Sequence, residues 1–547
     1  MVDSNDPAIT PKAIATLVLF IISIFFVIYP VAIPLRIPRK VGSPSRHIYI
    51  NLSTAPILII AILWVSRCID ATVVRDGIVG TDGVKPYNIL ILFFCLAYMA
   101  ITLDVTGVLR AAAFWVSNRS GSNARKLFFY FYAMLTVMSV VIGNDPIILS
   151  ATVFLVYYTQ IMQLQPLSWL IAEFATANTA SMVLFVGNPT NVVICEGFRI
   201  NNVAFSAYTV FPFIACSISC FAALRFQFRS SNYIPKRLRV LGHLDIRSVL
   251  HDPLSAWVGG TLLACCLAVM LVVSFFGVDV WKITLPFAVA KFVFDMAWDD
   301  CKYRRTQVVQ ESAVDINVED DEAMLREIQR AAATLSTRSS QPEPPAANAT
   351  TVVDPSHTLA PNSSAFASKS YKLRTVITHL KHHFPTFSKS FRRLPFSLVP
   401  FAFSQFILIE GLASQGWIDI FAIWLVRASG RKMYPTVWLV GVLGVFLCNL
   451  SGTNIGATIL LTKVMRAADL PDNTLRAGGI ALAVASNIGA VSFTFSASLA
   501  GLLWRSILLD KGVKISQSTF AFWNLLPIAV MTCVGLAVVS VEMAVIY

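Results

Sequence analysis

Two clusters of polar residues interrupt apolar stretches in the first half of this chain. Asn144-Asp145-Pro146 breaks one stretch, and Gly187-Asn188-Pro189-Thr190-Asn191 breaks the next. The carboxylate of Asp145 could bind a cation or carry a proton, or it could simply cap the helix that follows. In the second cluster, Gly and Pro unwind a helix, so that side-chain and freed carbonyl oxygens could coordinate a cation or accept hydroxyl donors. A simple loop is the other interpretation of that cluster.

The second half carries a corresponding pair of interruptions. Asn449, Ser451, Thr453 and Asn454 form a polar tip within one apolar stretch, and residues 492–498 break the next. Hydroxyls in these segments could line a binding site, although serine and threonine also hold membrane helices together.

The two halves match at offsets near 309 residues. Residues 105–109 align with 414–418, and 177–181 align with 486–490, which pairs Asn178 with Asn487. The first pair of tips aligns at an offset of 305. Paired interruptions at corresponding places point to the binding site of a transporter, because broken backbone survives in a bilayer only beside protein or a water-filled cavity. The predicted solute or ion site consists of Asn144, Asp145, Asn178, Gly187, Asn188, Pro189, Thr190, Asn191, Asn449, Ser451, Thr453, Asn487, Thr494, Ser496 and Ser498.

The composition is that of a multi-pass membrane protein. Hydrophobic residues make up 56% of the 547 residues and charged residues only 13%, whereas a soluble domain carries roughly 25% charged residues. The net charge of +13 does not indicate nucleic acid, because the Lys and Arg residues cluster in short loops. The ten cysteines show no metal-binding spacing, and no enzyme motif is present. We therefore expect no enzyme activity, no metal and no cofactor.

Five segments are predicted along the chain. Residues 1–49 form a transmembrane helix and a basic loop, and 50–225 form a first transmembrane repeat with a hairpin at 127–163. Residues 226–298 hold a basic loop and connecting helices, and the polar segment 299–394 is expected to be a cytoplasmic, largely disordered linker. Residues 395–547 form the second repeat, with a hairpin at 435–467.

The hairpins are predicted to be re-entrant. Each arm of the first would have ~16 residues and a length of about 24 Å, which is shorter than the ~30 Å hydrocarbon core. Two ordinary helices joined by a tight turn are the alternative.

Further charged residues lie in or near predicted spans. Glu173, Glu410 and Asp104 could include a proton relay, or each could lie at a helix end. Lys291 and Asp295 are four residues apart, which predicts a local ion pair.

The order of broken hairpin, Gly-x-Pro-x-Asn break at 187–191 and second hairpin resembles the ion transporter superfamily. This group includes arsenite/antimonite permeases, sodium/proton antiporters of the NhaD type, citrate-transporter-like proteins and dicarboxylate/sodium symporters. The segment 487–504, with Gly489, Ser498-Leu499-Ala500 and Leu503-Trp504, resembles the closing motif of the arsenite permeases in particular. The resemblance covers residues 50–225 and 395–545.

This resemblance implies an all-α polytopic fold with two inverted repeats, each with a re-entrant helical hairpin and an unwound transmembrane helix. It also implies a homodimer in the symporter branch. The symporters carry Ser-Asn-Thr at both tips, whereas the first tip here carries Asp145, which would repel a dicarboxylate.

The expected function is therefore efflux of arsenite or antimonite, coupled to a proton or ion gradient, with Asp145 as the coupling acid. Alternatives are a cation/proton antiporter, a citrate or organic-anion transporter and, from another class, an ion channel. The expected partners are a small inorganic or organic solute, a proton or sodium ion, and the lipid bilayer. The plasma membrane is the expected location, with an organelle membrane as the alternative.

Overall fold

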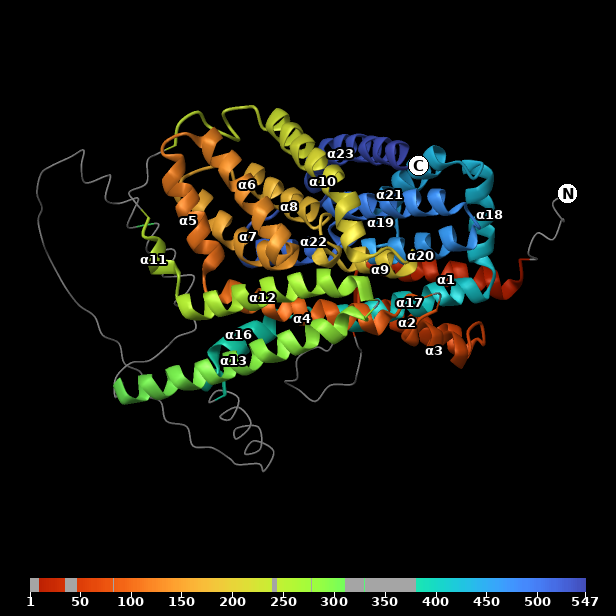
Figure 1. The fold of residues 1–547 in the computed structure, drawn as a ribbon, viewed down its shortest axis with the longest axis horizontal. Helices are drawn as coiled ribbons and strands as arrows, with labels where there is room; N and C mark the ends of the chain where they lie inside the picture. Colours follow the sequence, from red (N-terminus) through yellow and green to blue (C-terminus); the bar gives the residue numbers. More distant parts are fainter. Residues whose placement is uncertain are drawn as a thin grey trace, which may run out of the picture.

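The computed structural model describes residues 9–34, 47–81, 83–238, 244–276, 278–309, 329 and 380–547. These residues are almost entirely helical (Figure 1). Within these ranges, the only strands are β1 (Val31–Pro34) and β2 (His47–Ile50), which form an antiparallel pair. Nine helices of the described chain are long and apolar enough to cross a membrane. The predicted all-α, multi-pass membrane fold is thus confirmed.

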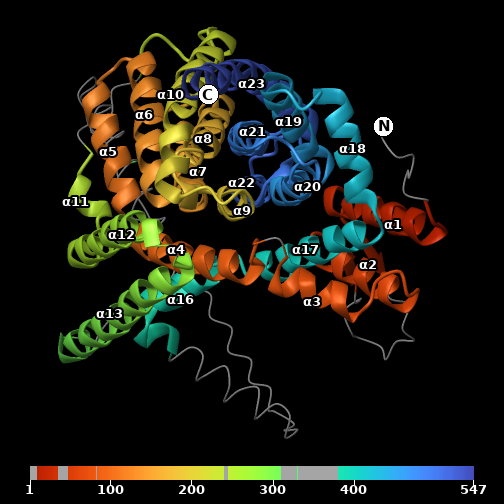
Figure 2. The same cartoon turned by 45° about the vertical axis from the view of Figure 1, so that its right-hand side comes forward.

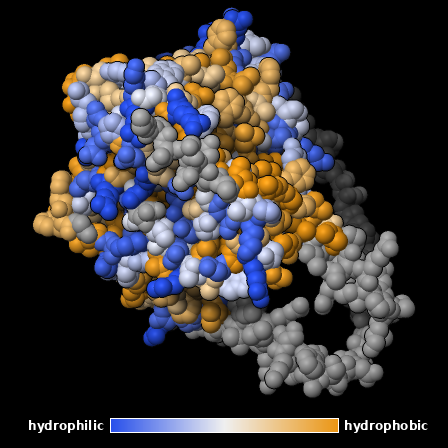
Figure 3. Space-filling view, turned by 90° about the vertical axis from the view of Figure 1, so that its right-hand side faces the viewer, coloured by the Kyte–Doolittle hydropathy of each residue, from blue (hydrophilic) through white to orange (hydrophobic). Residues whose placement is uncertain are grey.

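The surface fits a molecule whose sides face lipid. Large apolar side chains such as Trp257, Phe275 and Val541 are more than half exposed. Figure 3 views the molecule from one end, with polar side chains across the middle of the face and apolar side chains around much of its edge. Exposed apolar area of this extent indicates contact with hydrocarbon rather than water.

The first half begins after α1 (Pro11–Ile28), α2 (Thr54–Val65) and α3 (Ala71–Val79). Its elements are α4 (Pro86–Val105), α5 (Val108–Ser120), α6 (Ala124–Ile142), α7 (Asn144–Ile161), α8 (Pro166–Ala180), η1 (Phe185–Gly187), α9 (Pro189–Gly197) and α10 (Asn202–Gln227). The connecting part holds α11 (Ile246–Val249), α12 (Pro253–Val273), η2 (Ser274–Phe276), α13 (Val280–Val309) and α16 (Pro385–Arg393).

The second half repeats this order of elements. It contains α17 (Leu398–Ser414), α18 (Trp417–Ser429), α19 (Met433–Leu450), α20 (Asn454–Ala467), α21 (Asp472–Val491), η3 (Phe495–Ala497), α22 (Leu499–Asp510) and α23 (Gln517–Ile546). The backbone repeats in detail as well. Gly107 (φ 91°) corresponds to Gly416 (φ 77°), and Asn188 (φ −148°, ψ 141°) to Ser498 (φ −144°, ψ 151°).

The breaks occur close to the predicted places, with three differences. The arms of the first hairpin have 19 and 18 residues and meet at Gly143 (φ 94°), so they are longer than predicted. The next helix already ends at Ala180, and the chain stays unwound from Ser181 to Asn188. The second repeat is also interrupted before its predicted hairpin, at Gln415 and Gly416, where the positive φ of the glycine turns the chain.

Both ends of the predicted linker are helical. Residues 299–309 continue α13, and 385–393 form α16, whereas most of the remaining predicted linker lies outside the described residues. Asp299 accepts hydrogen bonds from the backbone N and Oγ1 of Thr386, both at 2.8 Å, and Arg393 Nη1 lies 3.1 Å from Asp104 Oδ2. These tertiary contacts hold α16 against α13 and α4, on one side of the bundle (Figure 2).

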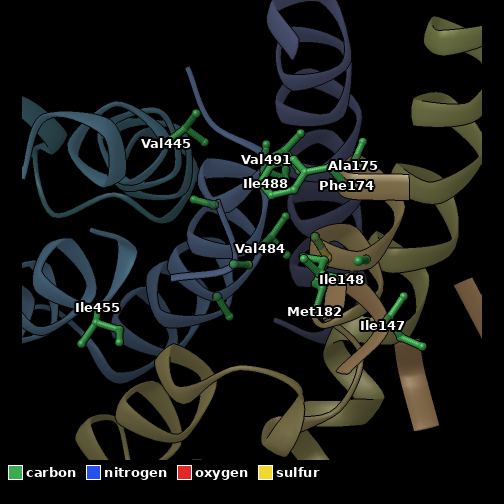
Figure 4. Close-up of a cluster of buried hydrophobic side chains, with 14 of the residues drawn as sticks. Ile147, Ile148, Phe174, Ala175, Met182, Val445, Ile455, Val484, Ile488 and Val491 are labelled. Atoms are coloured by element: carbon green, nitrogen blue, oxygen red, sulfur yellow. The ribbon is translucent and has the colours of Figure 1, made fainter. Parts of the chain in front are cut away.

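The two halves share one apolar core. Ile148 of α7, Phe174 of α8 and Met182 lie with Val484 and Ile488 of α21 in a single buried cluster (Figure 4). Small residues bring α19 and α21 close together, since a Cβ added at Gly489 would lie 2.7 Å from Cβ of Cys448. Such close approach is the usual source of helix association in a membrane.

The predicted ion pair between Lys291 and Asp295 is present in α13 and buried, with side chains at most 1% exposed. Asp295 Oδ2 also accepts a hydrogen bond from Tyr98 of α4 at 3.0 Å. Lys291→Met should lower the free energy of unfolding by about 3 to 5 kcal/mol, because it leaves a buried charge without its partner.

Denaturant unfolding in detergent measures this loss. Adding Asp295→Asn to Lys291→Met should recover most of it, because the amide carries no charge and still accepts from Tyr98. A double variant as unstable as the single variant would contradict this account.

Candidate functional site

A small cavity lies where the first turns of α7, α9, α20 and α22 meet, two helices from each half. We call these turns the four helix starts and the space between them the four-helix cavity. Asn144 and Asp145 line it from α7, Asn188 and Pro189 from α9, and Ser498 from α22. The cavity volume is about 20 Å³, which is room for about one water molecule.

Electrostatically, the cavity combines helix starts with one carboxylate. The first turn of a helix exposes backbone N–H groups and the positive end of the helix dipole. Asn188 Oδ1 accepts from the backbone N of Thr190 at 3.2 Å, and Ser498 Oγ accepts from that of Gly501 at 3.0 Å, so each cap satisfies one of these donors. No Lys, Arg or His side chain belongs to the described lining. The site therefore offers N–H donors and one acidic acceptor, Asp145.

Asp145 makes no hydrogen bond or ion pair with the described residues, and its side chain is partly exposed where it lines the cavity. Its neighbour Asn144 donates from Nδ2 to Oδ1 of Asn178 at 3.4 Å, a weak contact. A carboxylate held in this way is available to a proton, a cation or a hydroxyl group of a solute.

A carboxamide network fixes the first break. Asn191 Nδ2 donates to the carbonyl oxygens of Ser181 (2.9 Å) and Leu184 (2.8 Å), two groups that have left the helix. Asn487 of α21 donates from Nδ2 to Asn191 Oδ1 at 2.8 Å, and its Oδ1 accepts from Ser181 Oγ (2.9 Å) and Asn188 Nδ2 (3.2 Å). A residue of the second half thus completes the unwound segment of the first. These partners also explain why the helix ends earlier than predicted.

The second break is supported mainly from within its own half. Asn449 Oδ1 accepts from the backbone N atoms of Phe493 (2.7 Å) and Thr494 (3.3 Å), and Gln517 Nε2 donates to the carbonyl oxygen of Phe493. Ser498 Oγ donates to the carbonyl oxygen of Ala490 at 3.3 Å. Asn449 is therefore a backbone partner and does not line the cavity.

The structure sorts the predicted site residues into three groups. Five line the four-helix cavity: Asn144, Asp145, Asn188, Pro189 and Ser498. Five support that lining or the first break: Asn178, Gly187, Thr190, Asn191 and Asn487. The remaining five lie at the second hairpin tip and the second break, outside the lining: Asn449, Ser451, Thr453, Thr494 and Ser496.

Asn454 lines the cavity and was not among the predicted site residues. Its place in the repeat could have identified it, because α7 begins at Asn144 and α20 begins 310 residues later at Asn454. The offset of 305 used for the two tips instead pairs Asn144 with Asn449, which is wrong by five residues. Phe93, Ile455, Leu499 and Ala500 complete the lining, and their types carry no signal in the sequence.

A second, open pocket of about 450 Å³ lies at the other end of α9. Lys85, Glu196 and Asp279 are among its lining residues. Lys85 Nζ lies 2.7 Å from Asp279 Oδ1, and this contact raises the pKa of Lys85 and lowers the pKa of Asp279. Helix α9 therefore separates an open polar pocket from the four-helix cavity.

Apolar helices long enough to span a membrane, with breaks beside one shared cavity in two halves of the same element order, define a multi-pass membrane protein. The citrate transporter family matches residues 13–305, more than half of the chain, and the chain belongs to that family. The predicted resemblance to this superfamily is confirmed.

The chain is similar to other membrane transport proteins as well. The arsenical pump membrane protein of Escherichia coli is 24% identical over 213 residues, or 38% of this chain and 49% of that protein. The match thus spans about half the length of that relative. Two solved structures are similar at 12% identity: the YdaH transporter of Alcanivorax borkumensis (TM-score 0.44, 98% of both chains) and MtrF of Neisseria gonorrhoeae, described within a class of antimetabolite efflux pumps (TM-score 0.42, 96% of this chain and 93% of that chain).

The carboxamide network predicts unequal effects at two aligned asparagines. Asn487→Leu removes a partner of Ser181, Asn188 and Asn191, whereas Asn178→Leu removes a partner of Asn144. Each asparagine also donates to the carbonyl oxygen four residues earlier in its own helix, so this bond does not distinguish the two variants. Each buried polar group left without a partner costs about 1 to 3 kcal/mol. Asn487→Leu should therefore reduce the free energy of unfolding in detergent much more than Asn178→Leu. Equal losses would show that Asn487 does not hold the first break.

Proposed function

We propose that this protein is a secondary active transporter that carries a small oxyacid through the four-helix cavity by alternating access. The observation that carries the proposal is the meeting of four helix starts and one carboxylate around one small cavity. The cavity of about 20 Å³ is too small for a solute larger than water. A transporter with this structure would be in a closed state and must open to load and release its solute.

We further propose that the two halves are inverted repeats with re-entrant hairpins. Packing supports this, because α7 of the first half lies against α22 of the second, and α20 of the second lies against α9 of the first. In addition, α5 and the matching α18 lie at opposite ends of the molecule (Figure 1). An inverted pair of halves places a shared site at the interface between them, where exchange of their conformations alternates access.

Arsenous or antimonous acid is the solute that the lining favours, with efflux as the direction. A neutral oxyacid can donate its hydroxyl protons to Asp145 while its oxygens accept from the helix starts. It needs no cationic side chain, and the described lining contains none. The partial similarity to an arsenical pump supports the same class of solute.

An organic anion such as citrate is the second candidate, because the chain belongs to the citrate transporter family. The four helix starts would supply roughly half a positive charge each to a carboxylate ligand. Asp145 opposes that attraction. For this reason the polyanion is placed second.

Transport assays in proteoliposomes distinguish the two solutes. The purified protein should transport arsenite and antimonite and should not transport citrate. As a control, vesicles without protein give the background flux of each solute. Uptake of citrate without arsenite flux would support the second candidate and contradict the first.

Asp145 is the proposed coupling acid. Asp145→Asn should abolish uphill arsenite transport driven by a pH gradient while exchange down a concentration gradient continues, because the amide cannot carry a proton. The matched control is Asp510→Asn at the exposed end of α22, which should transport as the wild type does. Full coupled transport by Asp145→Asn would remove the coupling role. Flux that only follows the solute's own gradient, and that is the same in the wild type and in Asp145→Asn, would indicate a channel.

A further inference from the structure

Glu173 is a fully buried carboxyl group that the proposed transport steps do not use. It lies in α8 with 0% exposure. Its Oε1 accepts a hydrogen bond from Thr152 Oγ1 at 2.8 Å, and its Oε2 accepts from Trp504 Nε1 at 3.1 Å. Thr152 and Trp504 are themselves at most 1% exposed. A buried carboxyl group is costly in a membrane and is therefore usually retained for function.

These two bonds join the two halves of the protein. Thr152 belongs to α7 of the first half and Trp504 to α22 of the second. Both helices begin at the four-helix cavity, with Asn144 and with Leu499. At 1.5 Å per residue, Thr152 lies about 12 Å and Trp504 about 8 Å along its helix from that start. Glu173 thus links α7 to α22 at these distances from their starts at the cavity.

Aromatic packing makes the contact rigid. The ring of Trp504 lies 5.3 Å from that of Phe174, the neighbour of Glu173, and 5.5 Å from that of Phe520. The indole N–H can only donate, so an acceptor must face it in this buried position. In the described residues, the acceptor is Glu173 Oε2.

The matching place in the other half lacks this contact. The repeat pairs Thr152 with Thr462 and Trp504 with Ile194, and it places Glu173 opposite the apolar stretch 482–484. Thr462 Oγ1 is buried and has no hydrogen-bond partner among the described residues. The polar connection is therefore a specific addition to α7, α8 and α22 and not a consequence of the repeated backbone.

We infer that Glu173 is a positioning residue, which holds the starts of α7 and α22 at the spacing that binds the solute. The inference rests on the proposed function, because it assigns the four-helix cavity as the solute site. It requires two hydrogen-bonding oxygen or nitrogen atoms at this position and does not require a charge.

Two substitutions at Glu173 test the role. Glu173→Leu removes both hydrogen bonds and should raise the KM for arsenite about tenfold in proteoliposomes while the maximal rate changes little. Glu173→Gln keeps an acceptor for Trp504 and a donor for Thr152, so its KM should stay close to that of the wild type. Thr462→Val is the matched control in the other half and should leave the KM unchanged.

Hydrogen exchange in detergent gives a readout that needs no solute. Glu173→Leu should speed exchange in the first turns of both α7 and α22, and Glu173→Gln should not. This result would support the positioning role even if arsenite proved to be the wrong solute, in which case the wild type would show no arsenite flux. The inference is overturned if the Gln variant raises the KM as much as the Leu variant does, or if the Leu variant changes neither the KM nor the exchange.

Discussion

The structure depends on one constraint, namely that main chain which leaves a helix inside a membrane must find hydrogen-bond partners in the protein. Side-chain amides provide them at both breaks. Asn191 binds the free carbonyls of the first break, and Asn449 accepts from the free N–H groups of the second. Asn487 then joins the first break to α21 of the other half. Because these partners are internal, the unwound segments can hold the helix starts that follow them at fixed places around a cavity.

The two halves share a backbone but differ in chemistry. In the repeat, Asp145 of the first half corresponds to Ile455 of the second, and Glu173 corresponds to the apolar stretch 482–484. Both acids thus belong to the first half, and each lies at a contact with the second. A repeated backbone provides two equivalent sets of helix starts, and the acids make one set different. In the proposed transport function, this asymmetry would place an ion or proton on one side of the solute.

The sequence predicted the features that depend on local residue types. Asn144-Asp145-Pro146 marked the first hairpin tip, and serine and threonine residues marked the break at 492–498; both interruptions are present. The early end of α8 at Ala180 was not predictable, because it depends on Asn191 and Asn487, which approach Ser181 only in the folded protein. Asn454 was missed because the two halves were aligned by similar residue types, which paired Asn144 with Asn449, and not by the residues at which the helices begin. The helical ends of the linker escaped prediction for a related reason: contacts such as that of Asp299 with Thr386 stabilise them.

The central claim is that solute binds between the four helix starts. Antimonite offers the most direct measurement, because antimony scatters X-rays strongly and its anomalous signal locates it in a crystal of the intact protein. The account predicts one peak in the four-helix cavity, beside Asp145, Asn188 and Ser498. A peak confined to the open pocket beside Lys85 and Glu196, with none in the cavity at saturating antimonite, would contradict it.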